Sequence, residues 1–177
     1  MAKVKVKRTI EYKGPNRRDN FLSDLFKKLN PTVGCEVGVR NGRTTFHLLD
    51  KFPQLKMYAI DYDIKLFYSD KAMLKYGPRL KPIEGNSHNV HTEIEDESLD
   101  FVFIDASHDY ESVKDDIQYY TPKLKPNGWL CGHDIDFEGV NQAVSELLGK
   151  NYHIGANNVW FTCLDKMSPI PFKVLDF

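Results

Sequence analysis

The sequence has few cysteines, no long hydrophobic run and almost no net charge. Its three cysteines, Cys35, Cys131 and Cys163, are an odd number, and no two have the spacing of a zinc or redox motif. Each lies in an apolar stretch typical of a strand, so we expect buried, unreactive thiols. No apolar run approaches the ~20 residues of a membrane span, and the charged, alternating start does not resemble a signal peptide. These absences predict a cytoplasmic protein with no membrane partner.

Charge is unevenly distributed along the chain, although the net charge is only −1 over 177 residues. Residues 1–18 hold seven Lys or Arg and one acid, whereas the remainder is acidic. A basic segment on an acidic body could contact nucleic acid or a phosphorylated substrate. However, residues 3–9 alternate like an exposed edge strand, in which lysines discourage pairing with other chains. We therefore regard nucleic acid as an unfavoured partner.

The apolar pattern predicts one domain over residues 1–177, in which an N-terminal strand and helix (residues 1–30) could cap the active site. A helix is expected at 17–29, and then five short strands alternate with helices before a C-terminal hairpin at 152–165. Pro82 places the third strand at an edge of the sheet. The fold class is therefore α/β: a doubly wound, mostly parallel, seven-stranded Rossmann-like sheet with a C-terminal antiparallel hairpin and helices on both faces. The expected strands are 32–38, 56–61, 80–86, 98–108 and 127–134, and the expected helices are 43–52, 64–77, 109–124 and 137–150.

Polar side chains gather where these strands end. In doubly wound sheets, ligands bind beyond the carboxyl ends of the strands, near the point where the strand order reverses. The sequence therefore predicts a binding site that is formed by Glu36, Asp61, Asn86, Asp105 and Asp134.

A glycine-containing turn follows the first strand and indicates the kind of ligand. Gly38 and Gly42 allow a tight turn and a close approach of the backbone to a ligand. The GxGxxG pattern of a dinucleotide site is absent, because the turn reads Glu-x-Gly-x-x-x-Gly. A carboxylate such as Glu36 would repel a pyrophosphate but would suit a ligand that carries a cation. S-adenosylmethionine, with its sulfonium and ammonium groups, is such a ligand.

Several segments in order resemble the class I S-adenosylmethionine-dependent methyltransferases. They are "EVGVRNGRTT", "YAIDYD", "EGNS", "DFVFIDASHDYESVKDDIQYYTPKLKPNGWLCGHD" and the terminal hairpin. Together they cover roughly residues 30 to 165. The resemblance is greatest to small metal-dependent O-methyltransferases, which include catechol-type and sugar-modifying members.

This resemblance implies a set of cofactor contacts. Asp61 would accept hydrogen bonds from both ribose hydroxyls. It could instead, or in addition, serve as the N-cap of the next helix. Tyr62 would stack on the adenine or lie at the solvent edge as an ordinary tyrosine. The remaining expected contacts are Glu36 and Gly38 at the methionine half, Gly42 in the turn, Asn86 and Ser87 beside the adenine, and Asp105.

The resemblance also implies a divalent cation, magnesium or manganese, between Asp105 and Asp134. Such an ion would lower the pKa of a substrate hydroxyl and orient its oxygen for attack on the methyl group. Related enzymes take a third ligand from the residue after the second carboxylate, but here that residue is Ile135. His133 or Asp136 could replace it, and a histidine would favour manganese, iron or zinc over magnesium.

His108 lies three residues beyond Asp105, where catechol-type relatives carry a general base. An imidazole can take a hydroxyl proton near neutral pH. The alternatives are that His108 is a metal ligand or that it caps the helix beginning near Tyr110.

The predicted function is O-methylation of a small hydroxylated molecule, with Asp105 and His108 as the catalytic residues. One alternative keeps the cofactor but transfers the methyl group to nucleic acid or protein. Another is a nicotinamide-dependent oxidoreductase or a nucleotide-binding module without catalysis. The chain is short for this group, so a homodimer that completes the acceptor site is a further expectation.

Overall fold

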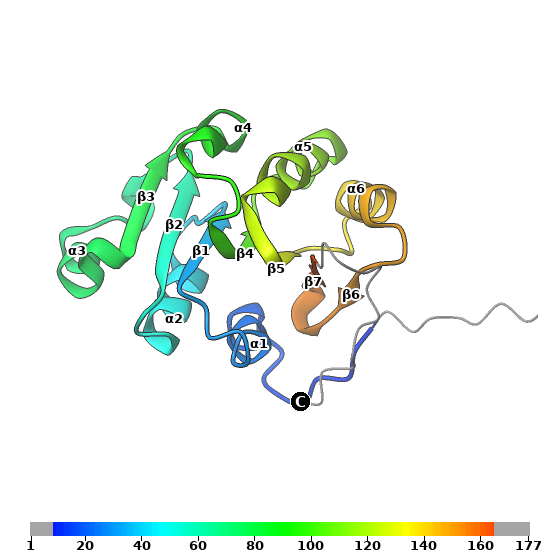
Figure 1. Cartoon of the computed structure of the whole chain (residues 1–177), viewed down its shortest axis with the longest axis horizontal. Helices are drawn as coiled ribbons and strands as arrows, with labels where there is room; N and C mark the ends of the chain where they lie inside the picture. The colour runs from blue at the N-terminus through cyan, green and yellow to red at the C-terminus, as the bar shows by residue number, and fades with distance from the viewer. Residues whose placement is uncertain (1–8, 165–177) are drawn as a thin grey trace, which may run out of the picture.

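The computed structural model describes residues 9–164 (Figure 1). The edge strand expected at residues 3–9 lies outside these residues except for Thr9, which forms an isolated parallel bridge with Ile154. Ile10 continues this contact, since its amide donates a hydrogen bond to the Ile154 carbonyl at 2.9 Å. The described chain thus begins beside the strand that contains Ile154, at one edge of the sheet.

A seven-stranded sheet runs through the described residues in the order β3-β2-β1-β4-β5-β7-β6. Strands β1 to β5 are parallel, β7 is antiparallel to β5, and β6 is antiparallel to β7. This arrangement confirms the predicted fold class, including the C-terminal hairpin and the edge position of the strand that contains Pro82. The strands are β1 (Val33–Val37), β2 (Lys56–Asp61), β3 (Leu80–Glu84), β4 (Leu99–Ile104), β5 (Leu124–Gly132), β6 (His153–Ile154) and β7 (Trp160–Cys163).

Helices cover both faces of this sheet (Figure 1). One face packs against α1 (Arg18–Leu25), α2 (Arg43–Lys51) and α3 (Asp70–Tyr76), and the other against α4 (Ser87–Val90), α5 (Tyr110–Tyr120) and α6 (Glu138–Leu148). Each layer buries its own hydrophobic cluster, as expected for a doubly wound sheet. Single 3₁₀ turns complete the connections: η1 (Ile64–Leu66), η2 (Gly77–Arg79), η3 (His91–Glu93), η4 (Thr121–Lys123) and η5 (Ala156–Asn158).

Helix α1 is part of the core rather than a separable cover. Phe21, Leu22, Leu25 and Phe26 are each at most 3% exposed. The Phe26 ring stacks on Phe101 of β4, with 4.3 Å between the ring centroids. Removing residues 17–29 would therefore unfold the sheet face as well as alter the site, so point substitutions are the informative tests of this helix.

The five expected helices are all shorter in the structure, by one residue at 43–52 and by more elsewhere. The helix expected at 17–29 ends at Leu25, and the remaining residues form turns. The helix expected at 64–77 is wrong as a single element, because η1 and α3 are separate. Asp63 caps η1 by accepting a hydrogen bond from the Lys65 amide at 3.0 Å, and Ser69 caps α3. Two N-caps within six residues start two short elements, which the apolar spacing could not reveal.

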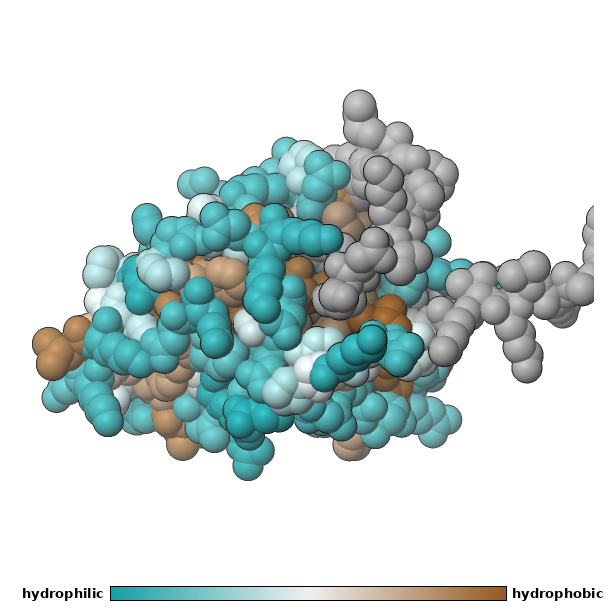
Figure 2. Space-filling view, turned by 90° about the horizontal axis from the view of Figure 1, so that it is seen from below, coloured by the Kyte–Doolittle hydropathy of each residue, from teal (hydrophilic) through white to brown (hydrophobic). Residues whose placement is uncertain are grey.

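Polar residues dominate the surface seen from below in Figure 2, with smaller hydrophobic areas between them. Across residues 9–164 we find no helix with the length and apolar character that crossing a membrane requires.

Candidate functional site

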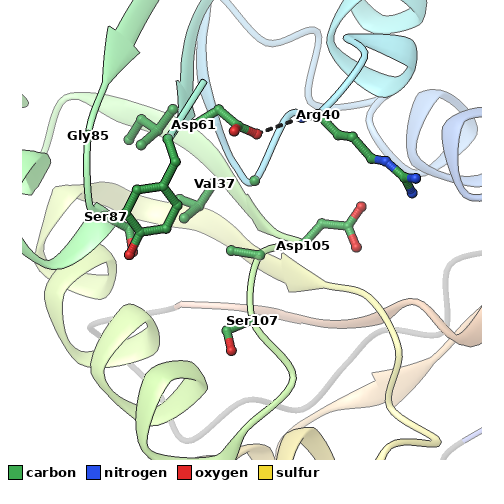
Figure 3. A pocket seen from close by; sticks show the side chains of 11 residues that line it. Val37, Arg40, Asp61, Gly85, Ser87, Asp105 and Ser107 are labelled. Carbon is green, nitrogen blue, oxygen red and sulfur yellow. Dashed lines mark hydrogen bonds between the residues drawn. The ribbon is translucent and has the colours of Figure 1, made fainter. Parts of the chain in front are cut away.

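A cavity of about 360 Å³ opens where the sheet order reverses, between β1 and β4 (Figure 3). This volume lies within the range of small-molecule sites. The lining residues follow the carboxyl ends of β1, β2, β3 and β4. They are Val37, Gly38, Arg40, Ile60, Asp61, Tyr62, Gly85, Ser87, Asp105, Ala106 and Ser107.

The turn after β1 brings two strand ends together. Gly38 has φ +88°, and a Cβ at this position would lie 2.4 Å from the carbonyl oxygen of Asp105. A side chain there would push β1 and β4 apart, so glycine is required. Gly42, with φ +79°, starts α2. It does not line the cavity, so the structure gives it a role in the turn.

Asp61 projects into this cavity at the end of β2. Its Oδ2 accepts a hydrogen bond from the Arg40 amide at 2.7 Å (Figure 3). Its Oδ1 accepts one from the Asp63 amide at 3.1 Å. The alternative role of Asp61 as a helix N-cap is wrong, because Asp63 caps η1. The Asp61 carboxylate is thus fixed in orientation, and its remaining lone pairs are open to a ligand.

The expected adenine contacts differ from one another. Ser87 and Tyr62 line the cavity, and Tyr62 is 71% exposed. Asn86 does not line it; its side-chain oxygen accepts a hydrogen bond from the His88 amide at 2.9 Å and caps α4. The structure therefore brings Ser87 and Tyr62 to the cavity and uses the Asn86 side chain to start the helix behind it.

Glu36 lies beneath the site rather than in its wall. It is 1% exposed, and its carboxyl group accepts a hydrogen bond from the Thr45 hydroxyl. Burial, with a smaller contribution from the nearby Asp105 charge, raises the pKa of Glu36 to about 8. At neutral pH this side chain is therefore mostly protonated, and it contributes a carboxyl group rather than the carboxylate that the sequence suggests.

We predict that Glu36→Gln stabilises the protein in a pH-dependent way. Below pH 4.5, the ordinary pKa of this group, the folded and unfolded chains both hold its proton and Glu36 has no effect. As pH rises from 4.5 to about 8, only the unfolded chain releases the proton, so the free energy of unfolding falls. Glutamine has no such loss. Urea unfolding at pH 5 and pH 8 should therefore show a larger gain for Glu36→Gln at pH 8.

The control for this prediction is Glu84→Gln, since Glu84 is an exposed carboxylate at the end of β3. Its effect should be small at both pH values. An equal effect of Glu36→Gln at pH 5 and pH 8 would show that the buried carboxyl group does not hold a proton.

Carboxylates and imidazoles gather beside this cavity at the ends of β4 and β5. His108 Nε2 lies 2.7 Å from Asp134 Oδ2, and His133 Nδ1 lies 2.9 Å from Asp134 Oδ1 and 3.3 Å from Asp105 Oδ1. Asp105, His108 and Asp134 each offer one ligand atom, and these three atoms lie within 4.8 Å of one another. Ile135 is buried and Asp136 is exposed. The geometry thus offers His108 as a third metal ligand, while His133 Nδ1 already lies within ion-pair distance of both carboxylates.

His108 does not cap the following helix. Asp109 takes that role by accepting a hydrogen bond from the Ser112 amide at 3.0 Å. The His108 ring instead stacks on Phe137, with centroids 4.6 Å apart. The imidazole is therefore held over the carboxylate cluster.

Arg18 is a site residue that the sequence analysis did not single out. Its Nη1 lies 3.0 Å from Asp105 Oδ2, and its Nε donates a hydrogen bond to Thr44 Oγ1 at 3.2 Å. The available signal was the Arg17-Arg18 pair at the start of the helix predicted to lie over the site. In the sequence, Arg18 stands out only as one of the positive charges of residues 1–18.

Burial and the neighbouring carboxylates shift the pKa of His133 in opposite directions. Burial lowers the pKa of His133, but the carboxylates of Asp105 and Asp134 outweigh burial and the pKa is raised overall. Within residues 9–164, its buried Nε2 has no hydrogen-bond partner.

Comparisons with known proteins identify this arrangement. The model of the family described as "Methyltransferase domain" matches residues 35–135, more than half of the chain. A search of curated proteins finds no match.

Among solved structures, a proposed caffeoyl-CoA O-methyltransferase from Staphylococcus aureus shares 18% identity and a TM-score of 0.68, covering 81% of this chain and 80% of that one. Cofactor-bound Rv0187 from MTB shares 16% identity and a TM-score of 0.67, over 88% and 82%. The MycE methyltransferase of the mycinamycin pathway, in complex with Mg and SAH, shares 16% identity and a TM-score of 0.61, over 85% and 51%. At these identities the likeness concerns the fold.

The fold, with its cavity at the switch point, is that of a class I S-adenosylmethionine-dependent methyltransferase. The chain belongs to the methyltransferase-domain family, and the resemblance noted in the sequence is confirmed.

Proposed function

We propose that this enzyme transfers the methyl group of S-adenosylmethionine to a hydroxyl group of a small molecule. One observation carries the proposal: Asp105 lines the cavity at the switch point and also belongs to the cluster with His108 and Asp134. Cofactor and acceptor would therefore meet at Asp105. The names of the Staphylococcus aureus and MycE neighbours are consistent with this chemistry.

The proposed cofactor contacts follow the cavity wall. Asp61 would accept hydrogen bonds from the ribose hydroxyls through the lone pairs that the two amides leave open. Tyr62 and Ser87 would lie at the adenine, and Gly38 and Asp105 at the methionine half. Glu36, Gly42 and Asn86 would support these contacts from behind, through a buried carboxyl group and two helix starts.

The donor set at the catalytic end fits a divalent cation. Asp105, His108 and Asp134 would hold it with two carboxylate oxygens and one imidazole nitrogen, a set that favours manganese over magnesium. When bound, the ion would supply Lewis-acid activation of the acceptor hydroxyl.

The protein's own groups would position the acceptor and take its proton. Where no metal ion occupies its imidazole nitrogen, His108 would itself accept the hydroxyl proton as the general base. Arg18 would offset the negative charge of Asp105, since its Nη1 lies 3.0 Å from Asp105 Oδ2. His133 would act through its contacts with Asp105 and Asp134, since its Nε2 is buried.

We also propose that residues 1–177 form one cytoplasmic domain whose acceptor is a small molecule. The three free cysteines are in keeping with a reducing compartment. The homodimer remains a prediction. The cap formed by residues 1–30 remains one as well, with α1 as a fixed part of it that also packs in the core.

S-adenosylhomocysteine binding tests the proposed function. At 100 times its dissociation constant this product should raise the free energy of unfolding by ~2.7 kcal/mol. Thermal unfolding with and without the ligand would measure the effect, and NAD⁺ at the same concentration is the control. If neither ligand shifts the unfolding temperature, or only NAD⁺ does, the proposed chemistry is wrong.

A further inference from the structure

A second cavity of about 280 Å³ lies beside the cofactor cavity and is lined entirely by polar residues. Three segments that are distant in sequence form it: the start of α1, the turn between β1 and α2, and η5. Four of its lining residues are arginines and only one is acidic. The lining residues are Arg17, Arg18, Asp19, Arg40, Asn41, Arg43 and Asn157.

The acidic residue, Asp19, holds two of these arginines in place. Its carboxylate accepts hydrogen bonds from Arg17 Nε at 3.1 Å and from Arg17 Nη2 at 2.5 Å, and it lies 3.5 Å from Arg43 Nε. The Asp19 side chain is only 2% exposed. Burial alone would raise the pKa of Asp19, but the Arg17 guanidinium outweighs burial and holds the pKa at about 2. An ionised, buried carboxylate thus fixes the guanidinium groups before any ligand arrives.

The third segment that lines this cavity, η5, is also held in place. The Asn157 amide donates a hydrogen bond to the Asn16 side-chain oxygen at 2.7 Å, which ties η5 to the segment before α1. Both helices that begin at the cavity, α1 and α2, lack a side-chain N-cap.

This arginine cavity is continuous with the site already described. Arg40 lines both cavities, and Arg18 reaches from the arginine cavity to Asp105 at 3.0 Å. In Figure 3 the Arg40 guanidinium extends away from Asp61, on the side where the Asp105 carboxylate lies. A molecule whose hydroxyl group sits at Asp105 could therefore place another group among the arginines.

The charge balance indicates what that group is. Asp19 balances Arg17, and Asp105 balances Arg18. Arg43 shares Asp19 with Arg17, and no carboxylate among residues 9–164 forms an ion pair with Arg40. Two positive charges remain, which matches a phosphate dianion better than a carboxylate.

We propose that the arginine cavity binds the phosphate of a small phosphorylated acceptor, which extends the proposed function from a hydroxylated molecule to a hydroxylated phosphate ester. The acceptor hydroxyl would lie at Asp105 and His108, and the phosphate between Arg17, Arg40 and Arg43. The enzyme would then select acceptors by a group remote from the reacting oxygen.

Binding of inorganic phosphate tests the proposal. Calorimetric titration of the full chain, saturated with S-adenosylhomocysteine, should detect phosphate binding. Arg43→Gln should weaken that binding about tenfold, because a charge-assisted contact is lost. Lys71→Gln on α3 is the matched control, since it removes the same charge from an exposed position away from the cavity. An equal loss in both variants, or no phosphate binding at all, would overturn the assignment.

Repeating the titration without S-adenosylhomocysteine shows whether the cavity serves an acceptor phosphate or the carboxylate of the cofactor. Unchanged phosphate affinity supports an acceptor site. Competition between phosphate and S-adenosylhomocysteine would mean that the cavity holds the cofactor's own carboxylate, and the proposal would be wrong. Failure of S-adenosylhomocysteine itself to bind would refute the proposed function, whereas its binding without phosphate binding would refute only this cavity assignment.

Discussion

Asp61→Ala is expected to weaken S-adenosylhomocysteine binding by about 100-fold, as the loss of two charge-assisted hydrogen bonds implies. The carboxylate lies in the cavity wall and is held by the amides of Arg40 and Asp63, so it is oriented before the ligand binds. Calorimetric titration would give the affinity directly. The variant should also unfold more easily, because the Arg40 and Asp63 amides lose their acceptor.

Asp63→Ala is the matched control for this prediction. Asp63 is also an aspartate, lies two residues away and caps η1. Its loss should cost about 1 kcal/mol of stability, as for other N-caps, and should leave the ligand affinity nearly unchanged. If folded Asp61→Ala binds S-adenosylhomocysteine as tightly as the original protein, the ribose is held elsewhere.

Asp134→Asn is expected to weaken Mn²⁺ binding by about 100-fold or more, since even partners behind the metal ligands change affinity by 10–100-fold in other sites. The charged oxygens of Asp134 lie against His108 and His133, at the end of β5. Asp134 does not line the cofactor cavity, so the affinity for S-adenosylhomocysteine should change little. Electron paramagnetic resonance of free Mn²⁺ would measure metal binding independently of catalysis.

Asp136→Asn serves as the control for Mn²⁺ binding. It removes the same charge two residues along the chain, where the side chain is exposed and outside the group formed by Asp105, His108 and Asp134. Equal weakening by Asp134→Asn and Asp136→Asn would reflect general attraction of a cation to an acidic surface. His108→Gln should weaken binding too, and His133→Gln should do so less.

The sheet could be predicted from the sequence because most of its strands are apolar and helical segments alternate with the first five of them. Phe101 to Ile104 are buried in β4, and Asp105 follows where the strand ends. In a parallel sheet such strand ends share one edge, so the ends of β1, β2, β4 and β5 converge whatever the details of the helices. This geometry is why Asp61, Asp105 and Asp134 were found from their positions alone.

Capping residues and burial were harder to predict. Sequence alone could not tell whether Asp61 or Asp63 would start the next helix, since aspartate suits the N-cap at either position. At the helix beginning at Tyr110, residue type favours Asp109 over His108, as the structure has it. The proton on Glu36 was missed for another reason. A pKa near 8 depends on complete burial, which only the packed fold shows.

Arg18 was missed because its function depends on a contact across the chain. The guanidinium comes from α1, whereas Asp105 follows β4. No local pattern links these positions. The arginine cavity could not be predicted for the same reason, since it is formed by residues 17–19, 40–43 and 157, which are distant in sequence.

Because α1 places Phe21 and Phe26 in the core and Arg18 at Asp105, the acceptor side of the site forms as the domain folds. Selection of the acceptor then needs no closing movement of this helix, and little ordering entropy is lost there when the acceptor binds. A change of acceptor during evolution would have to keep the buried side of α1 while altering only its first turn. Homologues of divergent specificity should therefore differ most at the positions of Arg17 and Arg18 and least at those of the two phenylalanines.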